Sequence, residues 1–172
     1  MSKFTQEEKT NNVLENILNR KSVRHYLEGK KIPDAQIQTL LKAGMAAPSA
    51  RNIQPWEFII VDDRDILDKL AERNTYGKML FSASHAIIVA GNTDKMGEHK
   101  DFWQQDAAAA TQNIMLMAES MGLGSVWIGV YPKEDRIQIA KDELNLPDNI
   151  IPFNIISLGY PDGTDKPKDM WN

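Results

Sequence analysis

The spacing of apolar residues in the first part of the chain predicts two helices. Thr5 and Glu8 form a capping-box pattern, and apolar residues then recur at helical spacing, which predicts a helix over residues 5–19. Pro33 and Asp34 open a second helix, whose apolar stripe reaches about residue 45. A polar loop over residues 47–55 interrupts the pattern there.

Further along the chain, four apolar runs rich in β-branched or aromatic residues predict strands. They cover residues 56–61, 86–90, 125–130 and 153–158. The pattern between them predicts helices at 65–73 and 101–121 and a third that begins at Pro132. This interleaving predicts a mixed α/β sandwich, but the hairpin and crossover signals leave the strand order open. The length of 172 residues predicts a single domain, 1–172.

The segment 101–121 is apolar around nearly its whole circumference. Trp103, Ala107, Ala110, Ile114 and Met117 form one stripe, and further apolar residues occupy the other faces. A helix of this kind must be buried on most sides, which in a small protein favours a subunit interface. The alternative is one central core helix.

Composition narrows the classes of partner and chemistry. The formal net charge of -4 disfavours nucleic acid and an anionic membrane surface as partners. Residues 1–12 lack the apolar core of a signal peptide, and no apolar run approaches the roughly 18 residues of a membrane span, so a cytoplasmic location is expected. Cysteine is absent, so redox chemistry must come from a cofactor.

Several familiar motifs fail on context. Gly122 and Gly124 resemble the start of a dinucleotide-binding motif, but they follow a helix, and Trp127 occupies the position of the third glycine. The three histidines are too scattered to propose a metal site, and His85 is expected to be a core histidine with its hydrogen bonds satisfied.

Two segments suit an anionic, planar ligand. Arg20, Lys21, Ser22 and Arg24 place three cations and a hydroxyl within five residues, a composition that can hold a phosphomonoester. Residues 47–56 place a hydroxyl, amides and an indole around two prolines, which suits the edge of a heterocycle. The alternatives are a solvated basic turn and an ordinary helix-to-strand connection.

Five segments in this order resemble the nitroreductase superfamily of FMN enzymes. They are residues 20–24, 47–56, 106–113, 122–129 and 158–161, so the resemblance extends from about residue 20 to residue 168. It implies an α+β fold, a nitroreductase-like three-layer α/β/α sandwich with a mostly antiparallel central sheet. It also implies an intertwined homodimer with FMN bound in the subunit interface.

The resemblance further implies which residues hold the cofactor. Arg20 and Ser22, with Lys21 between them, would hold the phosphate and ribityl chain together with a C-terminal lysine, Lys166 or Lys168. Many members carry a longer C-terminal segment that crosses to the other subunit, whereas only residues 162–172 follow Pro161 here. The choice between the two lysines, and whether this segment crosses, therefore stay open.

The flavin ring would have its own set of contacts. Backbone of Trp127, Ile128 and Gly129 would lie against the ring, with an amide near Gly129 facing N5. Arg24 would reach the pyrimidine edge and stabilise the anionic reduced ring, with Lys78 as a weaker candidate. The remaining contacts would come from the partner subunit: Pro48, Ser49, Ala50 and Asn52.

The activity implied is that of an NAD(P)H-dependent FMN oxidoreductase. It would transfer electron pairs to a small electron-poor acceptor such as a nitroaromatic or quinone. The alternatives are a relative that reduces enones or halogenated aromatics, and a protein that stores or senses flavin without turnover. The acceptor and the choice between NADH and NADPH stay open, because no acidic residue of a dinucleotide fold is present to indicate the donor.

Overall fold

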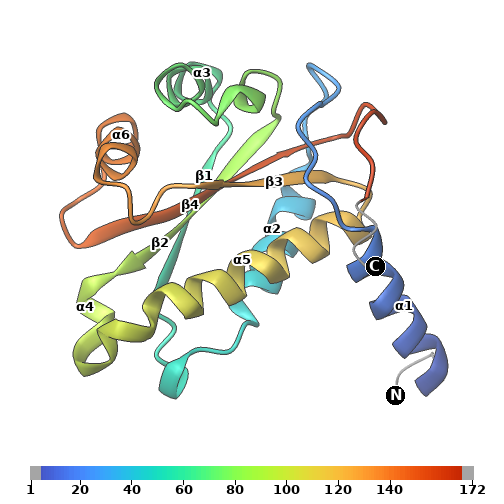
Figure 1. Ribbon diagram of the computed structural model, residues 1–172, viewed down its shortest axis with the longest axis horizontal. Helices are drawn as coiled ribbons and strands as arrows, with labels where there is room; N and C mark the ends of the chain where they lie inside the picture. The colour runs from blue at the N-terminus through green and yellow to red at the C-terminus, as the bar shows by residue number, and fades with distance from the viewer. Residues whose placement is uncertain (1–4, 168–172) are drawn as a thin grey trace.

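The computed structural model describes residues 5–167, apart from the side chains of Gln6 and His99, and is organised around one twisted sheet (Figure 1). Four strands form it in the order β1-β2-β4-β3, and every neighbouring pair is antiparallel. Their bounds are Trp56–Val61 for β1, His85–Asn92 for β2, Gly124–Gly129 for β3 and Ile150–Gly159 for β4. The four predicted strands and the antiparallel sheet are therefore confirmed, and β2 and β4 extend further than predicted.

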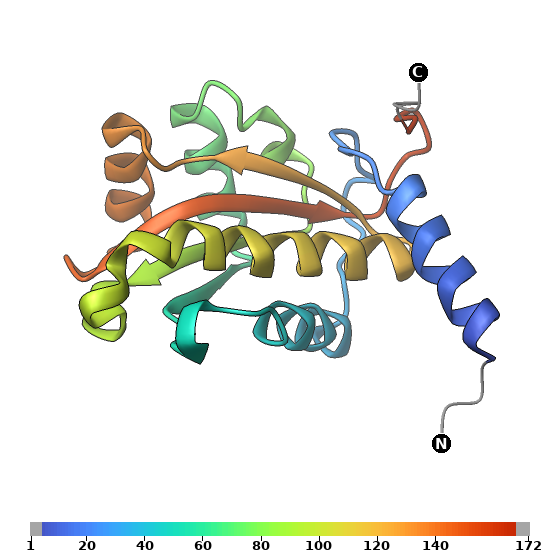
Figure 2. The same ribbon diagram turned by 60° about the horizontal axis from the view of Figure 1, so that its bottom comes forward.

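Helices cover both faces of this sheet (Figures 1 and 2). Helices α2 (Asp34–Met45) and α5 (Trp103–Ser120) lie on one face, and α3 (Arg64–Arg73) and α6 (Glu134–Leu144) lie on the other. Successive residues of a strand point to opposite faces, so the central strands are apolar on both sides. Ile87 of β2 packs in the α2–α5 cluster, whereas its neighbour Ile88 packs in the α3–α6 cluster.

Helix α1 (Gln6–Asn19) stands beside this body rather than on a face of the sheet (Figure 2). Its predicted capping box is confirmed, since Thr5 accepts from the Glu8 amide and Glu8 accepts from the Thr5 amide. The side chain of Asn16 ties the helix to the Leu116 carbonyl of α5 at 2.9 Å.

The long apolar helix packs in the core of its own chain. Ala107, Ala110, Ile114 and Ala118 of α5 are buried against α2 and the sheet, as the alternative interpretation of this segment required. Ala109 and Leu116, on its other faces, are only half-buried. His85 is also a core residue, 3% exposed and bonded to the Ser84 hydroxyl, as predicted.

Several predicted helix boundaries are wrong. Pro132 does not begin a helix, because α6 starts at Glu134 with Lys133 as its N-cap. The helix expected over 101–121 starts at Trp103, because residues up to Phe102 form the 3₁₀ segment η3 (Gly97–Phe102). The short elements η1 (Ala50–Asn52), η2 (Lys78–Phe81) and α4 (Thr93–Met96) were not predicted. Within residues 5–167, no helix is both long and apolar enough to cross a membrane.

Candidate functional site

The outer edge of β3 is the centre of the candidate site. Its Ser125 carbonyl accepts from the Val23 amide at 2.9 Å, whereas the Val130 amide, just beyond the strand, donates to Phe153 of β4 at 3.3 Å. Backbone groups of successive residues in an antiparallel strand alternate in direction. The backbone N–H and C=O groups of Trp127 and Gly129 therefore point outward from the free edge of the sheet, as those of Ser125 do.

Gly129 differs from the other glycines of the sheet. A Cβ built on Gly91, Gly124 or Gly159 would lie within 2.7 Å of a neighbouring side chain, so packing within the chain explains those three. A Cβ at Gly129 meets only the Arg136 guanidinium, at 3.9 Å, and Gly129 does not have a left-handed φ. Neither packing nor backbone conformation requires a glycine here, and the open position would allow close approach by a molecule outside the chain.

The basic segment, residues 20–24, lies along the start of this edge. Ser22 forms a parallel bridge with Ser125, and Val23 is buried beneath the segment. Arg20, Lys21 and Ser22 are half-buried and Arg24 is exposed. None of the three cations makes an ion pair with a carboxylate within residues 5–167. Positive charge without an internal partner is what an anion site needs.

The segment after β4 returns to the basic segment. The Asp165 carboxylate accepts from the Arg24 amide at 3.0 Å and contacts His25 Nδ1 at 3.3 Å. Burial opposes ionisation of Asp165, but these hydrogen bonds outweigh it and hold the pKa of that carboxyl below its usual value. Lys166 follows directly in the sequence, so it is one residue from the contact with Arg24, and its role toward a phosphate stays a prediction. Lys168 lies outside the described residues.

The loop that contains Pro48, Ser49, Ala50 and Asn52 is strained and braced. Arg51, Asn52 and Gln54 have φ values of 49°, 58° and 53°, a conformation that costs free energy in residues other than glycine. Ser49 Oγ accepts from the Gln54 amide at 2.9 Å. The buried Asp106 carboxylate accepts from the Ala50 amide at 3.0 Å, which anchors the loop to the first turn of α5.

This loop does not meet the basic segment of its own chain. The loop is tied to Asp106, near the start of α5, whereas the basic segment is tied to Ser125, just beyond the end of that helix. At about 1.5 Å per residue, Asp106 and Ser120 are about 20 Å apart along the helix. Figure 2 shows the two segments at opposite ends of α5.

Lys78 lies on the opposite side of the sheet from α5, beside α3. Its Nζ donates to the Ala71 carbonyl at 3.0 Å and to the Glu72 carbonyl at 3.4 Å, and it lies 5.8 Å from the centre of the Phe81 ring. This side chain therefore caps the end of α3, and its role toward a cofactor stays a prediction.

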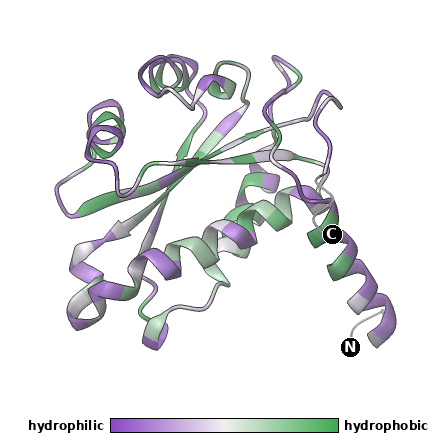
Figure 3. Ribbon diagram, in the orientation of Figure 1, coloured by the Kyte–Doolittle hydropathy of each residue, from purple (hydrophilic) through white to green (hydrophobic). Residues whose placement is uncertain are grey.

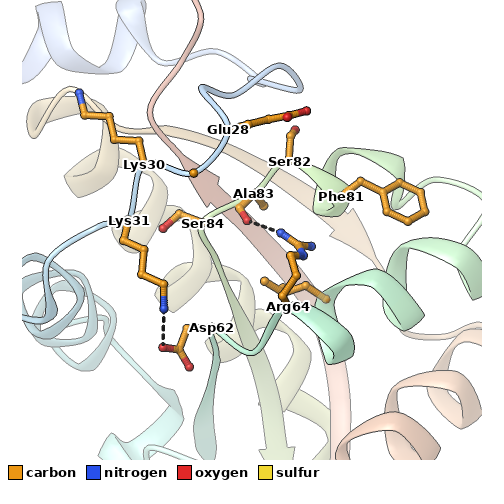
Figure 4. Close-up of a pocket in the computed structure, with 11 residues that line it drawn as sticks. Glu28, Lys30, Lys31, Asp62, Arg64, Phe81, Ser82, Ala83 and Ser84 are labelled. Carbon is orange, nitrogen blue, oxygen red and sulfur yellow. Dashed lines mark hydrogen bonds and ion pairs between the residues drawn. The ribbon is translucent and has the colours of Figure 1, made fainter.

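A cavity of 320 Å³ opens at the far end of β1, between residues 28–31 and residues 81–84 (Figure 4). Three of its charged side chains, Lys31, Asp62 and Arg64, have partners within the chain. Lys31 pairs with Asp62 at 3.8 Å, and Arg64 donates to the carbonyls of Leu80 and Ala83 and pairs with Asp68. None of the predicted site residues lines it.

The side chain of Trp127 belongs to an aromatic row on the α5 side of the sheet. Its ring packs edge-on against Phe153 at 5.4 Å, and Phe153 contacts Trp103 at 5.7 Å. Trp127 remains 36% exposed, so a large flat surface is available at the same edge as the Gly129 amide. Ile128, by contrast, is buried and points into the α3–α6 core.

Three residues that shape this site were not predicted from the sequence. They are Asp106, Asp165 and Arg136, whose Nη1 donates to the Gly129 carbonyl at 2.9 Å. Each forms a hydrogen bond to a segment that is distant in the sequence or belongs to another element, so the local sequence pattern does not indicate the contact. Only the unusual position of an arginine in the first turn of a helix gave a local signal.

Comparison with known proteins identifies the relatives of this fold. The model of the Nitroreductase family matches residues 17–75 and 70–160. A protein of Archaeoglobus fulgidus named as an NADH dehydrogenase/NAD(P)H nitroreductase is 47% identical over 148 residues, 86% of this chain and 84% of its own. A crystal structure under the same name from Parabacteroides distasonis is 50% identical, with a TM-score of 0.88 over 94% of both chains. A nitroreductase of Desulfovibrio desulfuricans, solved with FMN, is 30% identical, with a TM-score of 0.77 over 92% of both chains.

Proposed function

Because this chain belongs to the nitroreductase family, we propose that it binds FMN and transfers electron pairs from NADH or NADPH to a small electron-poor acceptor. Nitroaromatics and quinones are the acceptor classes proposed. When bound, FMN would supply the redox chemistry, accepting a hydride from the nicotinamide and passing the electrons on. The chain has no cysteine, so no thiol of its own competes for this role.

One observation carries the proposal: a glycine on the edge strand whose amide points outward and whose side-chain position is empty. A side chain at Gly129 would stand between the strand and a planar ring laid against it. The chain itself leaves that space open, with only Arg136 Nη1 within 4 Å. The Gly129 amide would donate to N5 of the ring.

The basic segment is proposed to hold the other end of the cofactor. Arg20, Lys21 and Ser22 would bind the phosphate and ribityl chain, assisted by Lys166. Arg24 lies further along, where its guanidinium would reach the pyrimidine edge and favour the reduced, anionic ring. Because these cations have no carboxylate partner among the described residues, an FMN phosphate would complete the charge balance.

The proposal includes a homodimer. Val13, Leu14, Ile17 and Leu18 of α1 are 46–63% exposed, and Figure 3 shows this hydrophobic stretch on the outside of the molecule. Beside it lies a groove of 420 Å³ between α1, α2 and α5. We propose that a second copy covers these surfaces and that Pro48, Ser49, Ala50 and Asn52 of that copy contact the flavin.

Steady-state turnover tests the proposed function. NADH and NADPH should each be tried against a panel of nitro, quinone, enone and halogenated acceptors, with purified protein saturated with FMN. Donor-dependent turnover of nitro compounds or quinones supports the proposal. Turnover confined to enones or halogenated aromatics would show that these compounds, rather than nitroaromatics and quinones, are the acceptors. No turnover with any combination of donor and acceptor would favour a flavin-storing or flavin-sensing protein.

A further inference from the structure

Arg136 is joined to the candidate site by a single hydrogen bond to backbone. Its Nη1 donates to the Gly129 carbonyl at 2.9 Å, and its guanidinium lies 4.9 Å from the centre of the Tyr76 ring. It makes no ion pair within residues 5–167, although it is half-buried. A partly buried cation that only stabilises the fold normally has a carboxylate partner, so stability alone does not explain the place of Arg136.

The position of Arg136 along α6 is also electrostatically unfavourable. It is the third residue of the helix, at the N-terminal end where the backbone amides carry partial positive charge. Acidic residues are favoured there, and Glu134 and Asp135 follow that rule. Arg136 departs from the rule and reaches across to β3 instead.

Gly129 is a residue that needs such an anchor. A glycine has more backbone freedom than any other residue, and β3 is the edge of the sheet, so no neighbouring strand holds the outward carbonyl of Gly129. The guanidinium of Arg136 supplies the hydrogen bond that a neighbouring strand would otherwise give. Tyr76, stacked on the guanidinium, limits the directions that the arginine can take.

We propose that Arg136 is a positioning residue: its hydrogen bond to the Gly129 carbonyl limits rotation of the backbone about Gly129, so that the Gly129 amide keeps its direction toward flavin N5. The inference rests on the proposed function, because it requires a flavin at this edge. It also places a cation beside the ring, next to the atom that changes most on reduction. The two effects have opposite signs: the amide favours oxidised flavin, whose N5 lone pair accepts its hydrogen bond, whereas the cation favours the anionic reduced ring. We expect the loss of the full charge to dominate the reduction potential.

The test compares the reduction potentials of FMN-saturated variants. Arg136→Met removes the charge and the donor but keeps an unbranched side chain. We expect it to weaken the binding of reduced FMN relative to oxidised FMN about tenfold, a fall of about 30 mV for a two-electron couple. Arg136→Lys, which keeps the charge and one donor, should restore part of the shift.

Arg73→Met is the matched control. Arg73 also contacts α6, but at Asp142 and Glu143, away from Gly129. Its replacement should leave the potential at the wild-type value. The melting temperature of each apoprotein separates a change in stability from a change in the site.

Three results would overturn the inference. An unchanged potential in Arg136→Met, an equal shift in Arg73→Met, or loss of the fold in both Arg136 variants would each assign Arg136 a structural or general electrostatic role. These results leave the proposed function standing, provided that wild-type protein binds FMN and is reduced by NADH or NADPH. Wild-type protein that binds no FMN would overturn both.

Discussion

At the scale of single residues, substitutions at two glycines of β3 can distinguish an effect on packing within the chain from an effect on ligand binding. Gly124 and Gly129 stand at the two ends of β3, and both would gain a methyl group on substitution by alanine. At Gly124 the new Cβ would lie 2.6 Å from Val23 Cγ1, whereas at Gly129 it would have open space. The two positions therefore differ in what the methyl group would disturb.

Gly129→Ala should leave the apoprotein as stable as wild type or slightly more stable, because alanine restricts the unfolded chain. A methyl group against a closely fitting ring costs about 1–3 kcal/mol, so FMN should bind roughly 10- to 100-fold more weakly. Gly124→Ala should instead lower the free energy of unfolding by about 1–3 kcal/mol. Denaturant unfolding and fluorescence titration with FMN measure both quantities, and unchanged FMN affinity in Gly129→Ala contradicts the proposed ring position.

The two arginines of the basic segment should be separable. Arg20→Ala removes a charge-assisted contact to phosphate, worth about 1.5–3 kcal/mol, so FMN affinity should fall by about one to two orders of magnitude with little change in potential. Arg24→Ala should lower the potential of the saturated protein and slow its reduction. Reversed effects would exchange the two roles, and no effect from either variant would make the segment an ordinary solvated turn.

At the scale of elements, the C-terminal segment is held beside the basic segment by backbone contacts to residues 25–27 and by the Asp165 carboxylate, which accepts from the Arg24 amide. The pKa of Asp165 is lowered in the folded protein, so its contribution to stability is present above its unfolded pKa and is lost as the pH falls through the folded pKa. Glu57 on β1 behaves similarly, because Asn92 and Lys95 hold its pKa down as well.

Asp165→Ala should weaken FMN binding at pH 7, because it removes the contact with Arg24 that holds the residue next to Lys166 in place. It should also flatten the loss of unfolding free energy between about pH 5 and pH 2, relative to wild type. Asp162→Ala, which removes the hydrogen bonds donated by the Thr164 amide and hydroxyl within the same segment, is the control for FMN binding and should affect FMN less. Equal effects of the two variants on FMN affinity would mean that the segment contributes only general order.

The elements that the sequence predicted well are those with a strong local pattern. The β-branched run of β2 and the capping box at Thr5 each depend on residues close together in the chain. The anchors at Asp106 and Asp165 join residues 56 and 141 positions apart, and the strand order also depends on pairing between segments distant in the chain, which no local pattern records. The start of α6 was missed because Pro132 suits a first helical turn, yet here it precedes the cap.

At the scale of the whole molecule, the proposed flavin site is shared between two copies of the chain. Leu18 is 63% exposed on the outer side of α1. In a monomer, Leu18→Glu would leave the stability unchanged or raise it. In the proposed dimer, it would place a charge in a buried interface. We expect light scattering to show dissociation of the variant and FMN affinity to fall with it. Phe81→Glu, which alters an exposed aromatic on η2, should stay dimeric; a monomeric wild-type protein that retains FMN would contradict the shared site.

An anaerobic titration shows whether this molecule is an FMN enzyme driven by a nicotinamide donor. Purified protein saturated with FMN is mixed with NADH or NADPH while the flavin absorbance is followed. We expect at least one donor to bleach one flavin per chain. Flavin that stays oxidised with both donors, or a protein that retains FAD and does not bind FMN, would overturn the proposed function.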